Sequence, residues 1–242
     1  MQLVIFDLDG TLIDSKLDLA HSVNSMLSYL GRPPISHELI NSYVGNGAPV
    51  LVRRALGPEA SEAEAAQALD FFIRYYAQHC LDNTSLYPGV QNALDRLRDA
   101  GLRLAILTNK PVRISNQIVR NLGVGDHFFR VYGGNSFDQK KPNPVGIETL
   151  MQETNSSREQ TMMVGDSAVD VLTARNAQVG ACGVTYGFQP ETLQAEPPDL
   201  LVDNLEQFAD FALRRSVVYR RTSPSTAPLS PLPFDPPDPA EL

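Results

Sequence analysis

The pattern of apolar and polar positions divides the chain into a first strand, a helical block and a long alternation of helices and strands. Residues 3–6 form an uninterrupted apolar run, which is typical of a central strand covered on both faces. From about residue 15 to residue 84, apolar side chains recur at helical intervals, and glycine and proline separate the segments. We therefore expect a strand followed by an all-helical block.

Helices and strands alternate in the second part of the chain. The predicted helices there include one that Pro144 should open at its first position, one at residues 168–177 and one that continues through Phe208. Such alternation indicates an α/β fold with a parallel sheet and helices on both faces, in which the helical block is an inserted lid. The five further strands are predicted at residues 102–107, 128–132, 161–164, 181–185 and 200–202.

The composition is that of a globular protein. The chain has 242 residues, of which 43% are hydrophobic, so it can bury one large core or two smaller ones. The net charge is −8 and the basic residues form no long cluster, which argues against nucleic acid as a partner. Without a basic leader or an apolar run of ~18 residues, we expect a cytoplasmic protein with no membrane partner. Cys80 and Cys182 have no metal-ligand spacing and are interpreted as reduced thiols.

The last stretch, residues 216–242, differs in composition from the rest. It carries seven prolines and almost no periodic apolar pattern, which predicts a disordered, flexible or polyproline-like tail. Proline-rich segments can bind a partner in an aromatic groove, but the sequence favours a bare solvated extension. The expected division is therefore a core of residues 1–14 and 85–215, a helical cap of residues 15–84, and this tail.

Polar side chains follow the predicted strands. Asp7 and Asp9 come directly after the first strand and indicate a metal site or an acid–base pair, unless one of them only caps the next helix in an Asx-turn. Taken alone, Asp166 could be only a helix N-cap and Asp170 only a solvated residue. All these groups, however, lie at the sheet edge at which ligands bind. The polar residues after the later strands are Thr108, Asn109, Lys140, Lys141, Asp166 and Asp170.

This set of groups is suited to phosphoryl transfer with a hard divalent cation. Mg²⁺ takes oxygen ligands and is held by a few carboxylates together with substrate phosphate, so Asp7 and Asp166 would supply its charge. Lys141 and the hydroxyl of Thr108 would stabilise the negative charge on the phosphoryl oxygens. One carboxylate can also act as a covalent nucleophile, through an aspartyl-phosphate.

Four stretches resemble, in order, the four motifs of the haloacid dehalogenase superfamily of phosphatases. They are residues 7–11, 108–109, 141–142 and 165–170. The resemblance extends over about residues 1–215, and it implies a Rossmann-like sheet with a C1-type helical cap. Residues 43–48 and 86–90 are similar to those of phosphoglycolate phosphatases, which implies a small phosphorylated metabolite as substrate, with 2-phosphoglycolate as the best single candidate.

The resemblance also implies a role for each acid. Asp7 would be the nucleophile, and Asp9 would protonate the leaving oxygen and later act as the base for water. Mg²⁺ would be held by Asp7, Asp166 and the backbone carbonyl of Asp9. Asp170 would orient Lys141 or a metal-bound water. An aspartate at position 9 favours a phosphatase over a dehalogenase.

The remaining site residues would bind the substrate. Thr108 would bind the phosphoryl oxygens, and Lys141 is preferred to Lys140 because the family motif has its lysine directly before proline. A phosphomutase or pyrophosphatase of the same superfamily, and a non-catalytic binding protein on this scaffold, are the alternatives. The other candidates for substrate binding are Gly10, Thr11, Gly45, Asn46, Gly47 and Asn109.

Overall fold

A six-stranded sheet forms the centre of the core. The computed structural model describes the backbone of residues 1–222 and the side chains of residues 1–215. The strands are parallel and have the order β5-β4-β1-β6-β7-β8. Phe6 at the end of β1 pairs with Ile106 of β4 and with Val164 of β6, so three central strands end side by side. The strands are β1 (Leu3–Phe6), β4 (Arg103–Leu107), β5 (Arg130–Tyr132), β6 (Thr161–Gly165), β7 (Gly180–Val184) and β8 (Leu200–Val202).

The six strands predicted from the apolar runs are confirmed, with small differences at their ends. The largest difference is at β5, which begins at Arg130 instead of residue 128. A short 3₁₀ helix, Gly125–His127, precedes it, and Phe128 and Phe129 lead from this turn into the strand. Strand ends are the part of such a prediction that the apolar pattern determines least, because apolar residues also anchor the adjoining turns.

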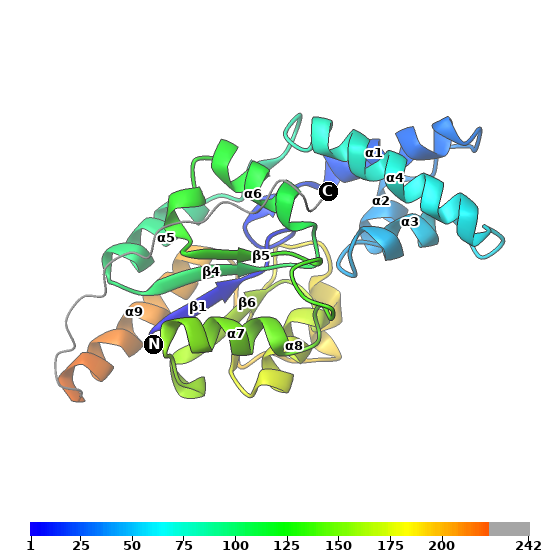
Figure 1. Cartoon of the computed structure of the whole chain (residues 1–242). Coiled ribbons are helices and arrows are strands. Elements are labelled where there is room, and N and C mark those ends of the chain that lie inside the picture. Colours follow the sequence, from blue (N-terminus) through cyan, green and yellow to red (C-terminus); the bar gives the residue numbers. More distant parts are fainter. Residues whose placement is uncertain (223–242) are drawn as a thin grey trace.

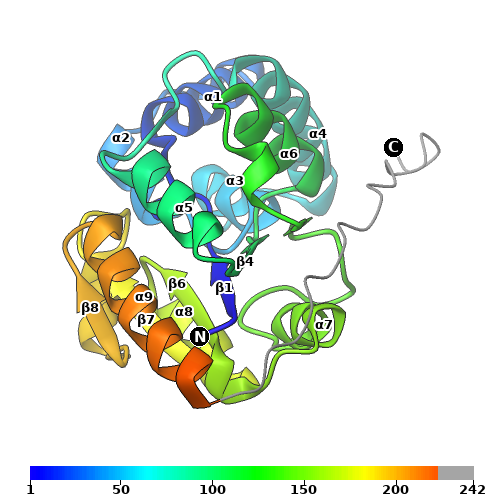
Figure 2. The ribbon, with the colours of Figure 1, turned by 90° about the vertical axis from the view of Figure 1, so that its left-hand side faces the viewer.

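Helices cover both faces of the sheet, and β1 divides the core into two layers. Val4 and Phe6 pack into one buried cluster and Leu3 and Ile5 into the other, because successive side chains of a strand point to opposite faces. This explains the uninterrupted apolar run of β1. The predicted α/β fold is confirmed (Figure 1), and Figure 2 shows α9 beside α5. The first cluster includes α5 (Val90–Asp99), α6 (Val112–Asn121) and α9 (Leu205–Thr222), and the second α7 (Val145–Thr154) and α8 (Ala168–Ala177).

The inserted cap lies beyond the carboxyl ends of the strands (Figure 1). Its helices bury apolar side chains such as Leu27, Leu51 and Phe72 against one another. The hydroxyl of Ser61 accepts a hydrogen bond of 3.2 Å from the backbone N–H of Glu64 and so caps the start of the longest helix of the cap. The cap helices are α1 (Lys16–Tyr29), α2 (His37–Ser42), α3 (Ala48–Leu56) and α4 (Glu62–His79).

A short antiparallel strand pair joins the cap to the core, and the apolar pattern did not predict it. Strand β2 (Ile13–Asp14) pairs with β3 (Ser85–Leu86), and two-residue strands are too short to produce a periodic signal. Asp18 stabilises this junction by accepting hydrogen bonds from the backbone N–H groups of Asn83 and Thr84 at 3.0 and 2.9 Å. Burial alone would raise the pKa of Asp18, but hydrogen bonds from Thr84 and Asn83 outweigh it and lower the pKa.

Two predicted boundaries are wrong. Residues 216–222, assigned to the tail, belong to α9, because no proline or glycine interrupts the helix before Pro224. The rest of the predicted tail, residues 223–242, lies outside the described residues. Helix α7 begins at Val145, so Pro144 is its N-cap and not its first residue; the side chain of Asn143 accepts a 3.0 Å hydrogen bond from the Val145 N–H.

The two cysteines agree with the expectation of reduced thiols. Cys80 follows α4 and Cys182 lies in β7, and both are free, buried thiols. Within residues 1–222, no helix has the length and apolar character needed to cross a membrane.

Candidate active site

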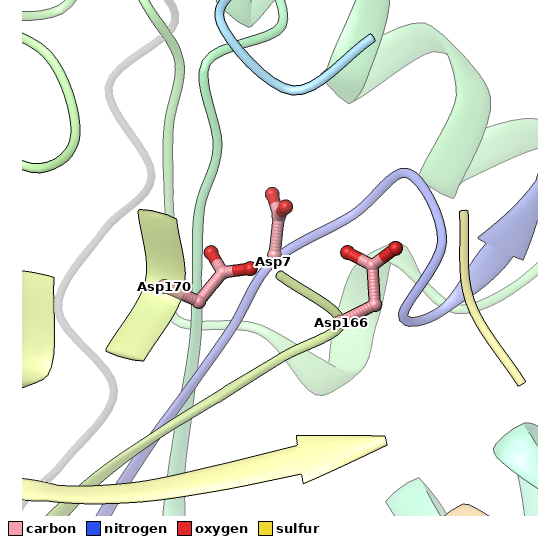
Figure 3. Close-up of side chains that lie close together, drawn as sticks. All are labelled: Asp7, Asp166 and Asp170. Atoms are coloured by element: carbon pink, nitrogen blue, oxygen red, sulfur yellow. The ribbon is translucent and has the colours of Figure 1, made fainter. Parts of the chain in front are cut away.

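Three buried carboxylates meet where β1 and β6 end. Asp7 follows β1, Asp166 follows β6, and Asp170 lies in the first turn of α8. Each offers an oxygen within 4.8 Å of those offered by the other two. Figure 3 shows Asp7 and Asp166 pointing the same way, with Asp170 turned toward Asp7. The pairing of β1 with β6 produces this arrangement, because it makes the two strand ends neighbours.

Lys141 is the cation of this cluster. Its Nζ lies 3.0 Å from Asp7 Oδ1 and 2.6 Å from Asp170 Oδ1. The other oxygen of Asp170 accepts hydrogen bonds from the backbone N–H and the hydroxyl of Ser167, so Asp170 is held rigidly at the helix start. Asp170 thus orients Lys141. Lys140 points elsewhere, with its Nζ near Gly47 of the cap.

The cluster carries more negative charge than the protein compensates. Burial raises the pKa of Asp7 to about 6, although Lys141 opposes this rise. Burial and the charges of Asp170 and Asp7 raise the pKa of Asp166 to about 8. When all three carboxylates are ionised, one ammonium leaves two negative charges without a partner, and a divalent cation that takes oxygen ligands would compensate them. Because both oxygens of Asp170 are already bonded, Asp7 and Asp166 are the ligands that fit.

The carboxylate of Asp9 lies apart from this cluster. It accepts a hydrogen bond of 2.5 Å from the hydroxyl of Ser15 and forms an ion pair with Lys110, whose Nζ lies 2.7 Å from Oδ1. Lys110 also donates to the hydroxyl of Tyr76 in the cap. Burial by itself would lower the pKa of Lys110, but Asp9 and Tyr76 outweigh it and raise the pKa, so this lysine is a permanent cation.

A cavity of about 50 Å³ lies between the core and the cap. The core contributes most of its polar groups, among them Asp7, Asp9, Thr108 and Asp166. The cap covers part of this site and so limits the access of water, which strengthens the electrostatic interactions inside it. The cap contributes mainly apolar walls, formed by Leu19, Val44, Ala48, Leu51, Phe72 and the ring of Tyr76.

Comparison with known proteins identifies the family. The family model for haloacid dehalogenase-like hydrolases matches residues 4–184. The chain belongs to this family. The resemblance inferred from the four motifs is therefore confirmed, and with it the prediction of a phosphatase of the haloacid dehalogenase type.

Individual relatives of this haloacid dehalogenase-like hydrolase carry a more specific name. The phosphoglycolate phosphatase of Vibrio vulnificus is 39% identical over 220 residues, which cover 88% of this chain and 96% of the relative. That of Pseudomonas putida is 44% identical over 211 residues, which cover 84% and 77%. The crystal structure of a predicted phosphoglycolate phosphatase from Haemophilus somnus has a TM-score of 0.82 at 33% identity and covers 87% of this chain and 97% of its own.

The predicted substrate-binding residues of this hydrolase fall into two groups. Thr108, Asn109, Gly45 and Gly47 line the cavity, whereas Asn46 lies in the same loop but is not among the lining residues. Asn109 Nδ2 donates a hydrogen bond of 2.9 Å to the carbonyl of Gly45, so the core and the cap loop meet directly at the cavity.

Gly10 and Thr11 do not line the cavity but pack next to residues of the site. A Cβ on Gly10, whose φ is +79°, would lie 2.2 Å from Asp166 Oδ2, so glycine permits the close approach of this carboxylate. Thr11 is buried, and its carbonyl accepts a hydrogen bond of 2.8 Å from the Tyr186 hydroxyl. Direct contact of these two residues with substrate stays a prediction.

Lys110 and the loop at residues 187–189 also belong to this site, and neither was predicted from the sequence. The backbone N–H of Phe188 donates to Asp166 Oδ2 at 2.6 Å. Gln189 Nε2 donates to the carbonyls of Ser42 and Val44 in the cap at 2.9 and 3.0 Å. The loop therefore links Asp166 to the cap. It follows the carboxyl end of β7, so the rule that ligands bind at this edge could have found it.

Proposed function

We propose that this chain is a Mg²⁺-dependent phosphatase that hydrolyses 2-phosphoglycolate to glycolate and phosphate through an aspartyl-phosphate on Asp7. The observation that carries the proposal is the uncompensated charge of Asp7, Asp166 and Asp170, whose ligand oxygens lie within 4.8 Å of one another. Asp7 and Asp166 also line the cavity beneath the cap, where a substrate would be enclosed.

We infer the metal ligands from the oxygen donors of the site. Asp7 and Asp166, together with the backbone carbonyl of Asp9, would hold Mg²⁺. When bound, the ion neutralises the carboxylates and the phosphate oxygens so that the anionic nucleophile and the anionic substrate can approach one another. Lys141 and the Thr108 hydroxyl would hold the other phosphoryl oxygens, and Asp170 keeps Lys141 in position for this.

The reaction proceeds in two steps in this proposal. A carboxylate oxygen of Asp7 forms a bond to phosphorus while the ester bond breaks, and its electron pair stays on the leaving oxygen, which receives a proton from Asp9. Glycolate then leaves. Asp9, now a carboxylate, takes a proton from water; the resulting hydroxide oxygen bonds to phosphorus, phosphate departs and the Asp7 carboxylate is regenerated.

The cavity favours a small substrate. The cavity, of about 50 Å³, lies between apolar cap walls and the polar ends of the strands, which supports a small substrate with few polar groups beyond its phosphate. The glycine loop at Gly45 and Gly47 would offer backbone amide groups to the short carboxylate end of 2-phosphoglycolate. The names of the Vibrio vulnificus and Pseudomonas putida relatives support the same substrate.

A panel of phosphorylated metabolites tests the proposal. Phosphate release with Mg²⁺ is measured for 2-phosphoglycolate, longer phosphorylated acids, sugar phosphates and pyrophosphate. We expect kcat/KM for 2-phosphoglycolate to exceed the others by about tenfold or more, since each extra methylene group must be accommodated in a small pocket. A preference for pyrophosphate, or conversion of a sugar phosphate without phosphate release, would contradict the proposed substrate. No phosphate release from any compound would contradict catalysis itself.

A further inference from the structure

Lys110 connects the Asp9 carboxylate to the cap. Its Nζ lies 2.7 Å from Asp9 Oδ1 and 3.0 Å from Asp9 Oδ2, and it donates a third hydrogen bond, of 2.5 Å, to the Tyr76 hydroxyl. Only 3% of the Lys110 side chain is exposed. The ammonium group is thus enclosed between a carboxylate of the core and a phenol of the cap.

The cap determines where Tyr76 lies. Tyr76 and Phe72 are one turn apart on α4, their rings stack with centroids 5.7 Å apart, and both are buried. The Lys110 Nζ lies 4.5 Å from the centroid of the Tyr76 ring, so the ring as well as the hydroxyl contacts the ammonium group. Movement of α4 away from the core would therefore remove both contacts from Lys110.

The two oxygens of Asp9 are held unequally. Oδ1 accepts hydrogen bonds from the Ser15 hydroxyl at 2.5 Å and from Lys110 at 2.7 Å, whereas Oδ2 has the longer contact with Lys110. Ser15 is the N-cap residue of α1, the first helix of the cap. Both donors to Oδ1 are thus connected to the cap, and Oδ2 is held only by the longer of the two contacts with Lys110.

We propose that Lys110 is a positioning residue that fixes the Asp9 carboxylate for proton transfer, and that it does so fully only while α4 holds Tyr76 against it. The inference rests on the proposed function, in which Asp9 protonates the leaving oxygen. Asp9 is protonated before this step and gives its Oδ2 proton to the ester oxygen as the P–O bond breaks. The carboxylate left behind forms the ion pair with Lys110, which keeps its own protons. Cap closure then excludes water and orients the acid in one movement.

Two aryl phosphates of similar size separate this role from a general structural one. Phenyl phosphate has a poor leaving group that needs protonation, whereas 4-nitrophenyl phosphate has a good one that needs little. kcat/KM reports the steps up to loss of the leaving group, so the ratio of the two kcat/KM values measures how well the acid works. A residue that only stabilises the fold changes both values equally and leaves the ratio unchanged.

Four single variants and one double variant make the test. We expect Lys110→Met to lower kcat/KM on the order of 10²-fold for phenyl phosphate but about tenfold or less for 4-nitrophenyl phosphate. Tyr76→Phe, which keeps the ring, should change the ratio in the same direction by roughly threefold. Tyr75→Phe, on the same helix with its ring stacked on Phe71 and His79 outside the cavity, should leave the ratio unchanged.

The double variant Asp9→Asn/Lys110→Met shows whether Lys110 acts through Asp9. We expect Lys110→Met to produce no further change in the ratio once Asp9 is Asn, because residues that act as a unit are not additive. Equal losses on both substrates in Lys110→Met, or the same change of ratio with and without the Asp9 carboxylate, would overturn the inference and leave the proposed function intact. An unchanged ratio in Asp9→Asn alone would overturn the assignment of Asp9 as the acid, and this inference with it.

Discussion

Gly47 and Gly57 form a matched pair for testing how the cap loop contacts the core. Gly47 precedes α3 with φ 85° and ψ 166°, and Gly57 follows it with φ 82° and ψ 173°. This backbone region is accessible to glycine almost alone, so alanine at either position costs about 1–3 kcal/mol of stability. The surroundings differ. A Cβ on Gly47 would lie 2.9 Å from the backbone carbonyl oxygen of Asn109, whereas no described atom lies within 4 Å of a Cβ on Gly57.

The contact at Gly47 crosses from the cap to the core, because Asn109 follows β4. A backbone carbonyl cannot turn aside as the end of a side chain can, so the cap of Gly47→Ala must retreat by a few tenths of an ångström when it closes. We expect this to cost the closed state about 1.4 kcal/mol beyond the cost shared with Gly57→Ala, which corresponds to a tenfold loss in kcat/KM.

The assay compares kcat/KM of both variants on 2-phosphoglycolate and on 4-nitrophenyl phosphate, and it measures their thermal midpoints. We expect both midpoints to fall by similar amounts, since the backbone strain is the same. Only Gly47→Ala should lose the tenfold in kcat/KM, and the loss should be larger on 2-phosphoglycolate, which depends more on the cap. Equal kinetic losses in the two variants, or no loss in Gly47→Ala, would refute the reasoning.

Two further predictions concern the acidic cluster. In the metal-free protein, the free energy of unfolding should decrease as the pH rises from about 4 to about 8. The pKa values of Asp7, about 6, and Asp166, about 8, are raised in the folded protein. The native state therefore binds more protons than the unfolded chain across this window. Urea unfolding at a series of pH values measures this, and the same slope in Asp166→Asn would count against it. Magnesium titrations of activity should show weakened metal binding in Asp166→Ala. Asp9→Asn should instead lose rate on the order of 10²-fold with little change in magnesium affinity. The assignment of Asp9 as the acid fails if Asp9→Asn is the variant that needs more magnesium.

The fold was predictable from the sequence where a helix or strand is long enough to show its own apolar pattern. Residues 3–6 are buried on both faces, so their uninterrupted apolar run indicated a central strand, and the parallel sheet followed from the alternation around it. The junction strands β2 and β3 left no such pattern, because two residues cannot show a period. The end of α9 was missed because the composition of residues 216–242 changes gradually, and the first proline comes only at position 224.

The residues of the candidate site that directly follow a strand were predictable from the sequence. Asp7, Asp166 and Asp170 are brought together by the pairing of β1 with β6. The predicted parallel sheet placed these strand ends at one edge, but the sequence pattern does not determine which strands are neighbours. The contacts of Lys110 were not predictable, because its partner Tyr76 belongs to the cap, and no local pattern says which face of α4 meets the core. Tyr76 reads in the sequence as one more apolar position of an amphipathic helix.

The central claim is that Asp7 is the nucleophile of a phosphatase, and replacing it tests the claim most directly. Phosphate release from 2-phosphoglycolate with Mg²⁺ is measured for the unaltered chain and for Asp7→Asn, with folding checked by circular dichroism and deamidation excluded by mass spectrometry. An amide is a poor nucleophile and a weaker metal ligand, so we predict release by the unaltered chain and a loss on the order of 10³-fold or more in a folded Asp7→Asn protein. Substantial turnover by folded, undeamidated Asp7→Asn would contradict the account.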